Sequence, residues 1–157
     1  MNACNNMGGF AMPTLYIMVG IPGAGKTTYA KSELSHAVYI GADALREKLY
    51  GKELTLRGYR RIHRLMLRYA KSYLKKGRDV VIDCANISLR ARKQYQKILS
   101  EKDKLIAVYI RSTLKQALAN NQKRSRHVPA FGILFMHLRF KQPHKTEGFC
   151  KVIYVDP

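Results

Sequence analysis

Acidic residues are scarce in this chain. Only 10 Asp and Glu accompany 29 Lys and Arg in 157 residues, which gives a formal net charge of +19. Residues 54–78 and 104–146 contain no acidic residue at all. Such an excess in a small domain indicates a polyanionic partner such as nucleic acid. The plainer alternative is a basic surface that serves only solubility.

Cysteine is also rare, and long apolar runs are absent. The three cysteines, Cys4, Cys84 and Cys150, are widely separated and form no CxxC pair. This excludes a disulfide framework and a cysteine zinc site, and it favours a reducing cytoplasm. No basic start followed by an apolar run marks a signal peptide, and no run is long enough to cross a membrane. We therefore expect no membrane partner.

The length fits a single domain, since domains hold roughly 100–200 residues. Residues 1–12 are small, polar and aperiodic, and we expect them to form a disordered N-terminal extension. Residues 13–157 then make up the domain itself. Whether translation starts at Met1 or Met12, and which oligomeric state the protein adopts, stay open.

The most informative stretch covers residues 20–28, which read GIPGAGKTT and match G-x-x-x-x-G-K-[ST]. It follows an apolar run and precedes a segment without helix breakers, which is the strand–loop–helix setting of a phosphate site. Glycines let successive backbone N–H groups converge on phosphate oxygens, and the helix N-terminus adds a partial positive charge. Lys26 can then reach the β- and γ-phosphates, and the Thr27 hydroxyl can hold Mg²⁺. The stretch predicts a site for ATP or another nucleoside triphosphate, formed by Gly20, Gly23, Ala24, Gly25, Lys26, Thr27 and Thr28.

Apolar runs alternate with helical segments along the rest of the chain. We expect strands at 15–19, 37–40, 79–83, 105–110 and 150–155. Helices are expected after the glycine loop and at 44–50, 56–76, 88–101, 113–123 and 129–140. This alternation predicts an α/β fold with a parallel sheet of about five strands and helices on both faces.

The segment 56–76 is the longest expected helix. Apolar residues at helical spacing predict its buried stripe: Ile62, Leu65, Met66, Tyr69, Ala70, Tyr73 and Leu74. Its other positions carry Arg57, Arg60, Arg61, Arg64, Arg68, Lys71 and Lys75. We interpret this helix as one wall of a groove that follows phosphates, with Arg64 and Arg68 in contact with the substrate. His63 is expected to pack or to face solvent, and Tyr59 or Tyr73 could stack on a base.

Two aspartates stand at the ends of expected strands. Asp43 follows 37–40 and Asp83 ends 79–83, and open α/β sheets bind their ligands at this edge. Arg46 lies three residues after Asp43, so the two share a helix face. Asp83 fits the Walker-B pattern, in which a carboxylate serves Mg²⁺ directly or through water. The alternatives are that Asp43 only caps a helix and that Asp83 only starts a turn.

A basic bend, 124–129, joins the last two expected helices. Its sequence is RSRHVP, late in the domain. This arrangement predicts a helical lid that brings arginines onto a transferring phosphate.

Four blocks taken together resemble the polynucleotide 5′-hydroxyl kinase family of P-loop kinases, the phage and bacterial end-healing enzymes. They are residues 20–28; Asp43-Ala44-Leu45-Arg46; residues 80–83 with Asn86; and residues 121–124 with Val128-Pro129. Pro143 with Glu147-Gly148-Phe149 is also similar to the tail of this wider kinase family. The resemblance covers nearly everything from Pro13 onward, and it implies a P-loop kinase fold with a helical lid.

The resemblance also implies a role for each matching residue. Lys26 and Thr27 would handle phosphate and Mg²⁺, and Asp43 would be the general base for the attacking hydroxyl. Arg46 would contact the transferring phosphate, Asp83 would position the acceptor end or help the metal, and Arg124 would be the lid arginine that contacts the donor nucleotide. The family usually has Arg-Asn where this chain has Asn120-Asn121, and Arg126 could replace the missing arginine. The 3′-phosphatase domain fused to some relatives is expected to be absent.

Three functions remain open from the sequence. The first is ATP- and Mg²⁺-dependent phosphorylation of the 5′-hydroxyl end of DNA or RNA, in nucleic-acid end healing and repair. The second is a kinase for a nucleoside, sugar or antibiotic, which leaves the charge of +19 unexplained. The third is a nucleic-acid-binding NTPase that phosphorylates no acceptor, which leaves Asp43 and Arg46 without a chemical role.

Overall fold

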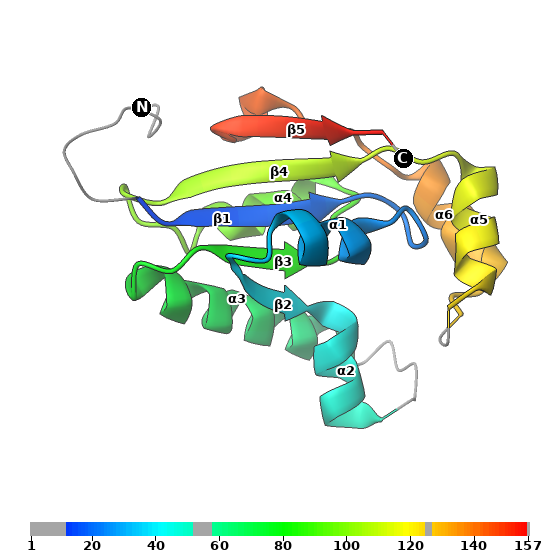
Figure 1. Cartoon of the computed structure of the whole chain (residues 1–157), viewed down its shortest axis with the longest axis horizontal. Coiled ribbons are helices and arrows are strands. Elements are labelled where there is room, and N and C mark those ends of the chain that lie inside the picture. The colour runs from blue at the N-terminus through cyan, green and yellow to red at the C-terminus, as the bar shows by residue number, and fades with distance from the viewer. Residues whose placement is uncertain (1–11, 52–57, 125–126, 157) are drawn as a thin grey trace.

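The computed structural model describes residues 12–51, 58–124 and 127–156, and its centre is a five-stranded parallel sheet (Figure 1). The strands lie in the order β2-β3-β1-β4-β5, so β1, the first strand in the sequence, lies in the middle of the sheet. Their bounds are β1 Thr14–Val19, β2 Val38–Gly41, β3 Val80–Asp83, β4 Lys104–Ile110 and β5 Lys151–Val155. All five predicted strands are confirmed, each to within one residue at either end.

The two central strands are buried on both faces. Every residue of β3 is buried, and Ile17 of β1 pairs with Ile82 on one side and Ala107 on the other. Parallel strands covered on both faces need continuous apolar runs rather than alternation, and this is the pattern that the sequence has.

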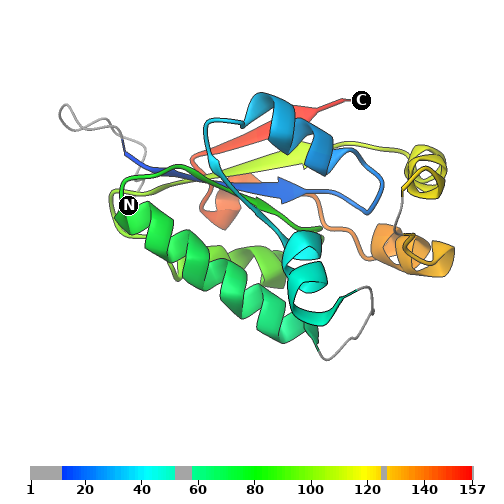
Figure 2. The ribbon, with the colours of Figure 1, turned by 60° about the horizontal axis from the view of Figure 1, so that its bottom comes forward.

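Helices cover both faces of the sheet, as predicted. Figure 2 shows α1 on one face, with α3 and α4 on the opposite face. The pair α5 and α6 lies beyond the carboxyl ends of the strands in both views (Figures 1 and 2). The bounds are α1 Lys26–Glu33, α2 Ala42–Tyr50, α3 Tyr59–Lys75, α4 Leu89–Gln96, α5 Leu114–Gln122 and α6 Ala130–Leu138. The predicted α/β architecture of the P-loop kinase fold is confirmed.

Helix α3 buries a stripe that differs slightly from the predicted one. Ile62, Met66, Ala70 and Leu74 are buried as expected, but Tyr69 is 45% exposed. The buried stripe is rotated toward α4, where the His63 ring packs 5.8 Å from the ring of Tyr95. Tyr69 lies at the opposite edge of the stripe, which is why its prediction was wrong.

Helix ends follow local chemistry. Gly51 ends α2 with a φ of 67°, a left-handed conformation that favours glycine, and this end was predicted. Ser88 caps α4, because its side chain accepts a hydrogen bond from Ala91 N at 3.2 Å. Helix α4 nevertheless ends at Gln96, about one turn earlier than predicted.

The predicted disordered extension and Arg57 lie outside the described residues, apart from Met12.

A buried arginine joins α4 to the C-terminal segment. Arg92 is 1% exposed and forms a two-pronged ion pair with Glu147, at 2.7 and 2.8 Å. Its guanidinium also donates to the backbone carbonyls of Asn86 at 2.9 Å and Lys141 at 2.8 Å. This one side chain therefore fixes the loop after β3 against the segment that leads into β5.

None of the helices in the described part of the chain is long and apolar enough to cross a membrane.

Candidate active site

A cavity of about 520 Å³ opens at the carboxyl ends of β1, β2 and β3. It brings together nine of the residues that the sequence nominated: Gly23, Gly25, Lys26, Thr27, Thr28, Asp43, Arg46, Asp83 and Arg124. The remaining lining residues are Pro22, Ala42, Tyr59, Cys84, Ala85, Asn120, Val128 and Met136. The loop, the two strand-end aspartates and the lid arginine therefore form one site, although they span most of the sequence.

The glycine loop takes a conformation that other residues rarely adopt. Gly23 and Gly25 have φ values of 86° and 98°, and α1 begins at the next residue, Lys26. A methyl group on Gly23 would collide with the backbone carbonyl of Ala117 in α5. The loop thus lies directly against the lid side of the molecule, and its N–H groups stand at a helix N-terminus, where anions bind.

Lys26 is a buried cation at the base of the site. Its side chain is only 9% exposed, and its Nζ donates to the carbonyl of Ile21 at 2.8 Å. Burial lowers the pKa of Lys26, while the nearby Asp83 carboxylate acts in the opposite direction. A buried ammonium with donors left over favours an anionic ligand, and this supports the predicted phosphate contact.

Thr27 and Asp83, the predicted Mg²⁺ ligands, are in direct contact. Thr27 Oγ1 donates to Asp83 Oδ2 at 2.5 Å, and the Asp83 side chain is buried. A second donor, the Tyr39 hydroxyl, reaches the same oxygen at 2.7 Å. A hydroxyl and a carboxylate supply the hard oxygen donors that Mg²⁺ prefers, with further positions left to phosphate and water. Among the described residues there is no cluster of three or more His, Cys, Asp or Glu suited to a metal.

Asp43 lies between two arginines. Its Oδ1 accepts from Arg46 at 2.7 Å, and Arg124 approaches Oδ2 at 3.7 Å. The alternative that Asp43 is an N-cap is wrong, because Gly41 occupies that position and Asp43 lies in the first turn of α2. The carboxylate is 56% exposed, so a ligand in the cavity can reach it.

Two asparagines of α5 fix the lid segment, one against the glycine loop and one across the bend. Asn120 Nδ2 donates to the carbonyl of Gly23 at 3.0 Å, so the position where the resembled family has arginine contacts the glycine loop. Asn121 exchanges hydrogen bonds with the backbone of Val128, at 2.8 and 3.0 Å, and fixes both sides of the bend. Arg126, the predicted replacement for the arginine, lies outside the described residues.

Four nominated residues do not line the cavity. Gly20 and Ala24 belong to the loop, but their N–H groups donate to backbone carbonyls of Ala85 and Ile21, so neither is available to a phosphate in this arrangement. Arg64 and Arg68 are exposed on α3, away from the cavity. Their contact with substrate stays a prediction.

The sequence reasoning missed Tyr39 as a member of the site and gave Tyr59 only as a side chain that could stack on a base. Tyr39 points back from β2 onto Asp83, and burial raises its pKa, so it remains a protonated donor at neutral pH. Tyr59 begins α3, lines the cavity and stacks on His63 with ring centres 6.4 Å apart. Tyr39 lies two residues before the end of β2, and nothing in the sequence shows that its hydroxyl reaches Asp83 on the neighbouring strand. Tyr59 carried only the general signal that a tyrosine can stack on a base.

The glycine loop at a helix N-terminus, the buried Lys26 and the Thr27–Asp83 pair define a nucleotide-binding P-loop protein of the kinase type. Residues 15–143 match the family described as AAA domain, and the chain belongs to this family.

One protein whose name includes polynucleotide kinase, and one chain in the solved structure of an RNA repair complex, are similar to this chain. The bifunctional polynucleotide phosphatase/kinase of Schizosaccharomyces pombe is 27% identical over 146 residues, which cover 88% of this chain and 32% of that protein. A chain in the structure of the Pnkp1/Rnl/Hen1 RNA repair complex superposes with a TM-score of 0.73 at 24% identity, over 86% of this chain and 45% of that one. This chain thus spans less than half the length of both proteins.

Sugar kinases share the fold as well. A gluconokinase from Sinorhizobium meliloti 1021 superposes with a TM-score of 0.59 at 18% identity and covers 92% of this chain and 83% of its own. At this identity the similarity shows the fold alone.

Proposed function

We propose that this protein transfers the γ-phosphate of ATP to the 5′-hydroxyl end of DNA or RNA. The observation that carries the proposal is the position of Asp43, which lies between Arg46 and Arg124 in the cavity that also contains Lys26 and Thr27. A carboxylate placed between two arginines beside the glycine loop suits an acceptor hydroxyl that attacks the γ-phosphate. We therefore assign a donor side to Lys26 and Thr27 and an acceptor side to Asp43 and Arg46.

Each residue of the site has its own role in phosphoryl transfer. Lys26 and the loop N–H groups bind the β- and γ-phosphates, and Arg46 and Arg124 neutralise charge on the transferring group. The acceptor oxygen forms the new bond to phosphorus as its proton passes to a carboxylate oxygen of Asp43, and the bond from phosphorus to the bridging oxygen breaks to release ADP. Thr27 and Asp83 would hold Mg²⁺, which supplies positive charge beside the phosphates when it is bound.

Two facts support a polynucleotide as acceptor over a small molecule. The formal net charge of +19 suits a polyanion that extends beyond the cavity, whereas a sugar or nucleoside needs no such field. The polynucleotide phosphatase/kinase is similar over 88% of this chain. An activity of this kind serves in nucleic-acid end healing.

The test is a transfer assay with γ-labelled ATP and Mg²⁺. The acceptors are DNA and RNA oligonucleotides with 5′-hydroxyl ends, the same oligonucleotides with 5′-phosphate ends, and a panel of nucleosides, antibiotics and sugars that includes gluconate. We expect label on the 5′-hydroxyl ends and none on the 5′-phosphate ends.

Two results contradict the proposal. Label on a small molecule with none on any oligonucleotide makes the protein a small-molecule kinase. Release of labelled phosphate that DNA or RNA stimulates, without label on any acceptor, makes it a nucleic-acid-binding NTPase.

A further inference from the structure

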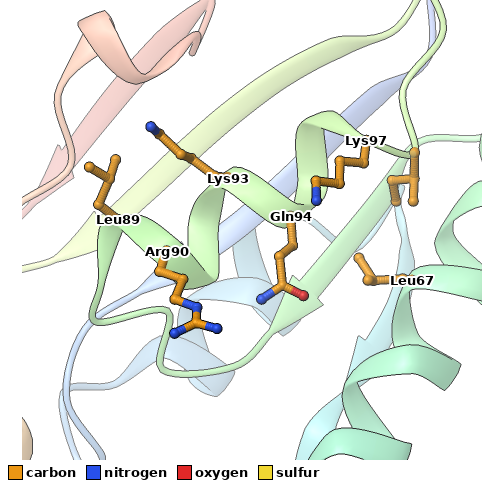
Figure 3. Close-up of a pocket in the computed structure, with 7 residues that line it drawn as sticks. Leu67, Leu89, Arg90, Lys93, Gln94 and Lys97 are labelled. Atoms are coloured by element: carbon orange, nitrogen blue, oxygen red, sulfur yellow. The ribbon is translucent and has the colours of Figure 1, made fainter.

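A second cavity, of about 600 Å³, lies on the α3 and α4 side of the sheet, away from the glycine loop. Leu67 of α3 forms one side of it (Figure 3). The other side consists of α4 and the two residues that follow it: Leu89, Arg90, Lys93, Gln94, Lys97 and Ile98. Neither the nucleotide site nor the proposed transfer step uses this cavity.

The α4 side of the cavity carries three exposed cations. Arg90, Lys93 and Lys97 are three and four residues apart, so they lie on the same side of this segment, although Figure 3 shows the Arg90 and Lys93 side chains pointing in different directions. Within the described residues none of them has a salt-bridge partner, and none of the residues that line the cavity is acidic. Three cations that repel one another without a partner favour a ligand with several negative charges.

The α3 side adds positive charge at the rim. Arg64 and Lys71 lie three residues before and four residues after Leu67, so all three share one face of α3. Both cations are exposed. Arg68 lies about 100° further round the helix than Leu67, on the outer surface.

The two helices that form this cavity both start near the active site. Tyr59, the first residue of α3, lines the nucleotide cavity, and so do Cys84 and Ala85, which lead into α4. Leu67 is eight residues from Tyr59, which corresponds to about 12 Å along a helix. The first cation of the row, Arg90, is in the first turn of α4. A chain that leaves the active site between the two helices therefore meets this cavity next.

We infer that the α3/α4 cavity binds the phosphodiester backbone of the acceptor strand, a few nucleotides downstream of the 5′ end. The inference rests on the proposed function and gives it a direction: the strand runs from Asp43 past Tyr59 and along α4. The cations contact phosphates, and the apolar side chains of Leu67, Leu89 and Ile98 give sugars and bases a surface to pack on. At about 3.4 Å per nucleotide of a stacked strand, the 12 Å to Leu67 correspond to roughly three to four nucleotides.

The experiment compares acceptors of two lengths in two variants of the full chain. The groove variant is Arg90→Ala, Lys93→Ala, Lys97→Ala. The control variant is Arg78→Ala, Lys102→Ala, Lys151→Ala, which removes the same charges from exposed positions at the opposite edge of the sheet, where the strands begin. Each protein is assayed with a 5′-hydroxyl dinucleotide and a 5′-hydroxyl 16-mer, and the binding of a labelled 16-mer is measured by fluorescence anisotropy from 50 to 200 mM salt.

We expect the groove variant to raise the KM for the 16-mer about tenfold more than it raises the KM for the dinucleotide, because only the longer acceptor reaches the cations. Its binding should depend on salt with a slope smaller by about 2, since each lost phosphate contact removes about 0.7. The control variant should behave like the unchanged protein in both assays. The inference is overturned if the groove variant raises the KM equally for the dinucleotide and the 16-mer. It is also overturned if the groove and control variants change the KM and the salt slope equally.

The readouts separate this inference from the proposed function. If no protein phosphorylates any oligonucleotide, the proposed function fails, and the anisotropy slopes alone decide whether the cavity binds nucleic acid. If transfer occurs but the groove variant keeps the 16-mer KM and salt slope, the cavity is not part of the acceptor path. Binding of the cavity to anionic vesicles or an acidic polypeptide, with the 16-mer unaffected by the groove variant, also overturns the inference.

Discussion

The Tyr39 hydroxyl donates a hydrogen bond of 2.7 Å to Asp83 Oδ2, the same oxygen that accepts from Thr27 at 2.5 Å. Tyr39 belongs to β2 and Thr27 to α1. The Asp83 carboxylate at the end of β3 therefore links two different elements. If Asp83 binds Mg²⁺, the Tyr39 hydroxyl would hold the carboxylate in its orientation without touching the metal, whereas Thr27 is itself a predicted ligand.

Tyr39→Phe tests that role. The ring stays in place, but Asp83 loses one of its two donors, and we expect the Mg²⁺ concentration for half-maximal activity to rise roughly tenfold. The measurement is the rate of transfer, or of ATP hydrolysis, against Mg²⁺ concentration. Tyr154→Phe is the matched control, because Tyr154 is a strand tyrosine of similar exposure, 43% against 37%, on β5. An unchanged Mg²⁺ requirement in Tyr39→Phe removes Tyr39 from the metal site.

Asp43→Asn separates chemistry from nucleotide binding. An amide keeps the size of the side chain but cannot take up the proton of the acceptor hydroxyl, so we expect the transfer rate to fall about 10²–10⁴-fold. ATP affinity should change little, because the donor side is formed by Lys26 and the glycine loop. The matched control is Glu47→Gln, one turn later on α2 and outside the cavity. A variant that still transfers phosphate at the original rate shows that Asp43 is not the base.

Arg92→Met tests the buried ion pair with Glu147. Methionine keeps the apolar part of the side chain but leaves the Glu147 carboxylate, which is 8% exposed, without its ionic partner. We therefore expect the free energy of unfolding to fall by about 3–5 kcal/mol. Arg111→Met is the control, because its ion pair with Asp156 is exposed on both sides, and such pairs contribute about 0–1 kcal/mol. Urea unfolding monitored by circular dichroism measures both. If Arg92→Met does not accumulate, Glu147→Gln is measured in its place. Equal losses at the two pairs contradict the buried role.

The donor side of the site was predictable because its residues are contiguous. Residues 23–28 are neighbours in one short loop and the helix start that follows it. The spacing of the glycines and Lys26 therefore predicts a phosphate site directly. Asp43 and Asp83 were predictable because parallel strands end at one edge of the sheet, so residues that follow different strands meet there.

The residues that were missed act through contacts between distant segments. Nothing beside Arg92 in the sequence shows that Glu147, 55 positions later, will neutralise it. Tyr39 and Asp83 are 44 positions apart and meet only because β2 pairs with β3. The shift of the buried stripe from Tyr69 to His63 likewise depends on where α4 packs, which periodicity within α3 does not contain.

His63→Phe tests the origin of acid sensitivity. His63 is 8% exposed, lies between the rings of Tyr59 and Tyr95, and its Nε2 is the buried side-chain atom without a hydrogen-bond partner among the described residues. Burial lowers the pKa of His63 below its usual 6.5, so the folded protein holds the ring neutral while the unfolded chain binds a proton. Stability is therefore unaffected above about pH 6.5 and falls as the pH drops from there toward the folded pKa.

Phenylalanine fills the same space and cannot take up a proton, so His63→Phe should lose less stability between pH 7 and pH 5 than the unchanged protein. Thermal unfolding across this range is the measurement. His137→Phe, an exposed position on α6, should keep the original loss. If His63→Phe also keeps it, the acid sensitivity does not originate at His63.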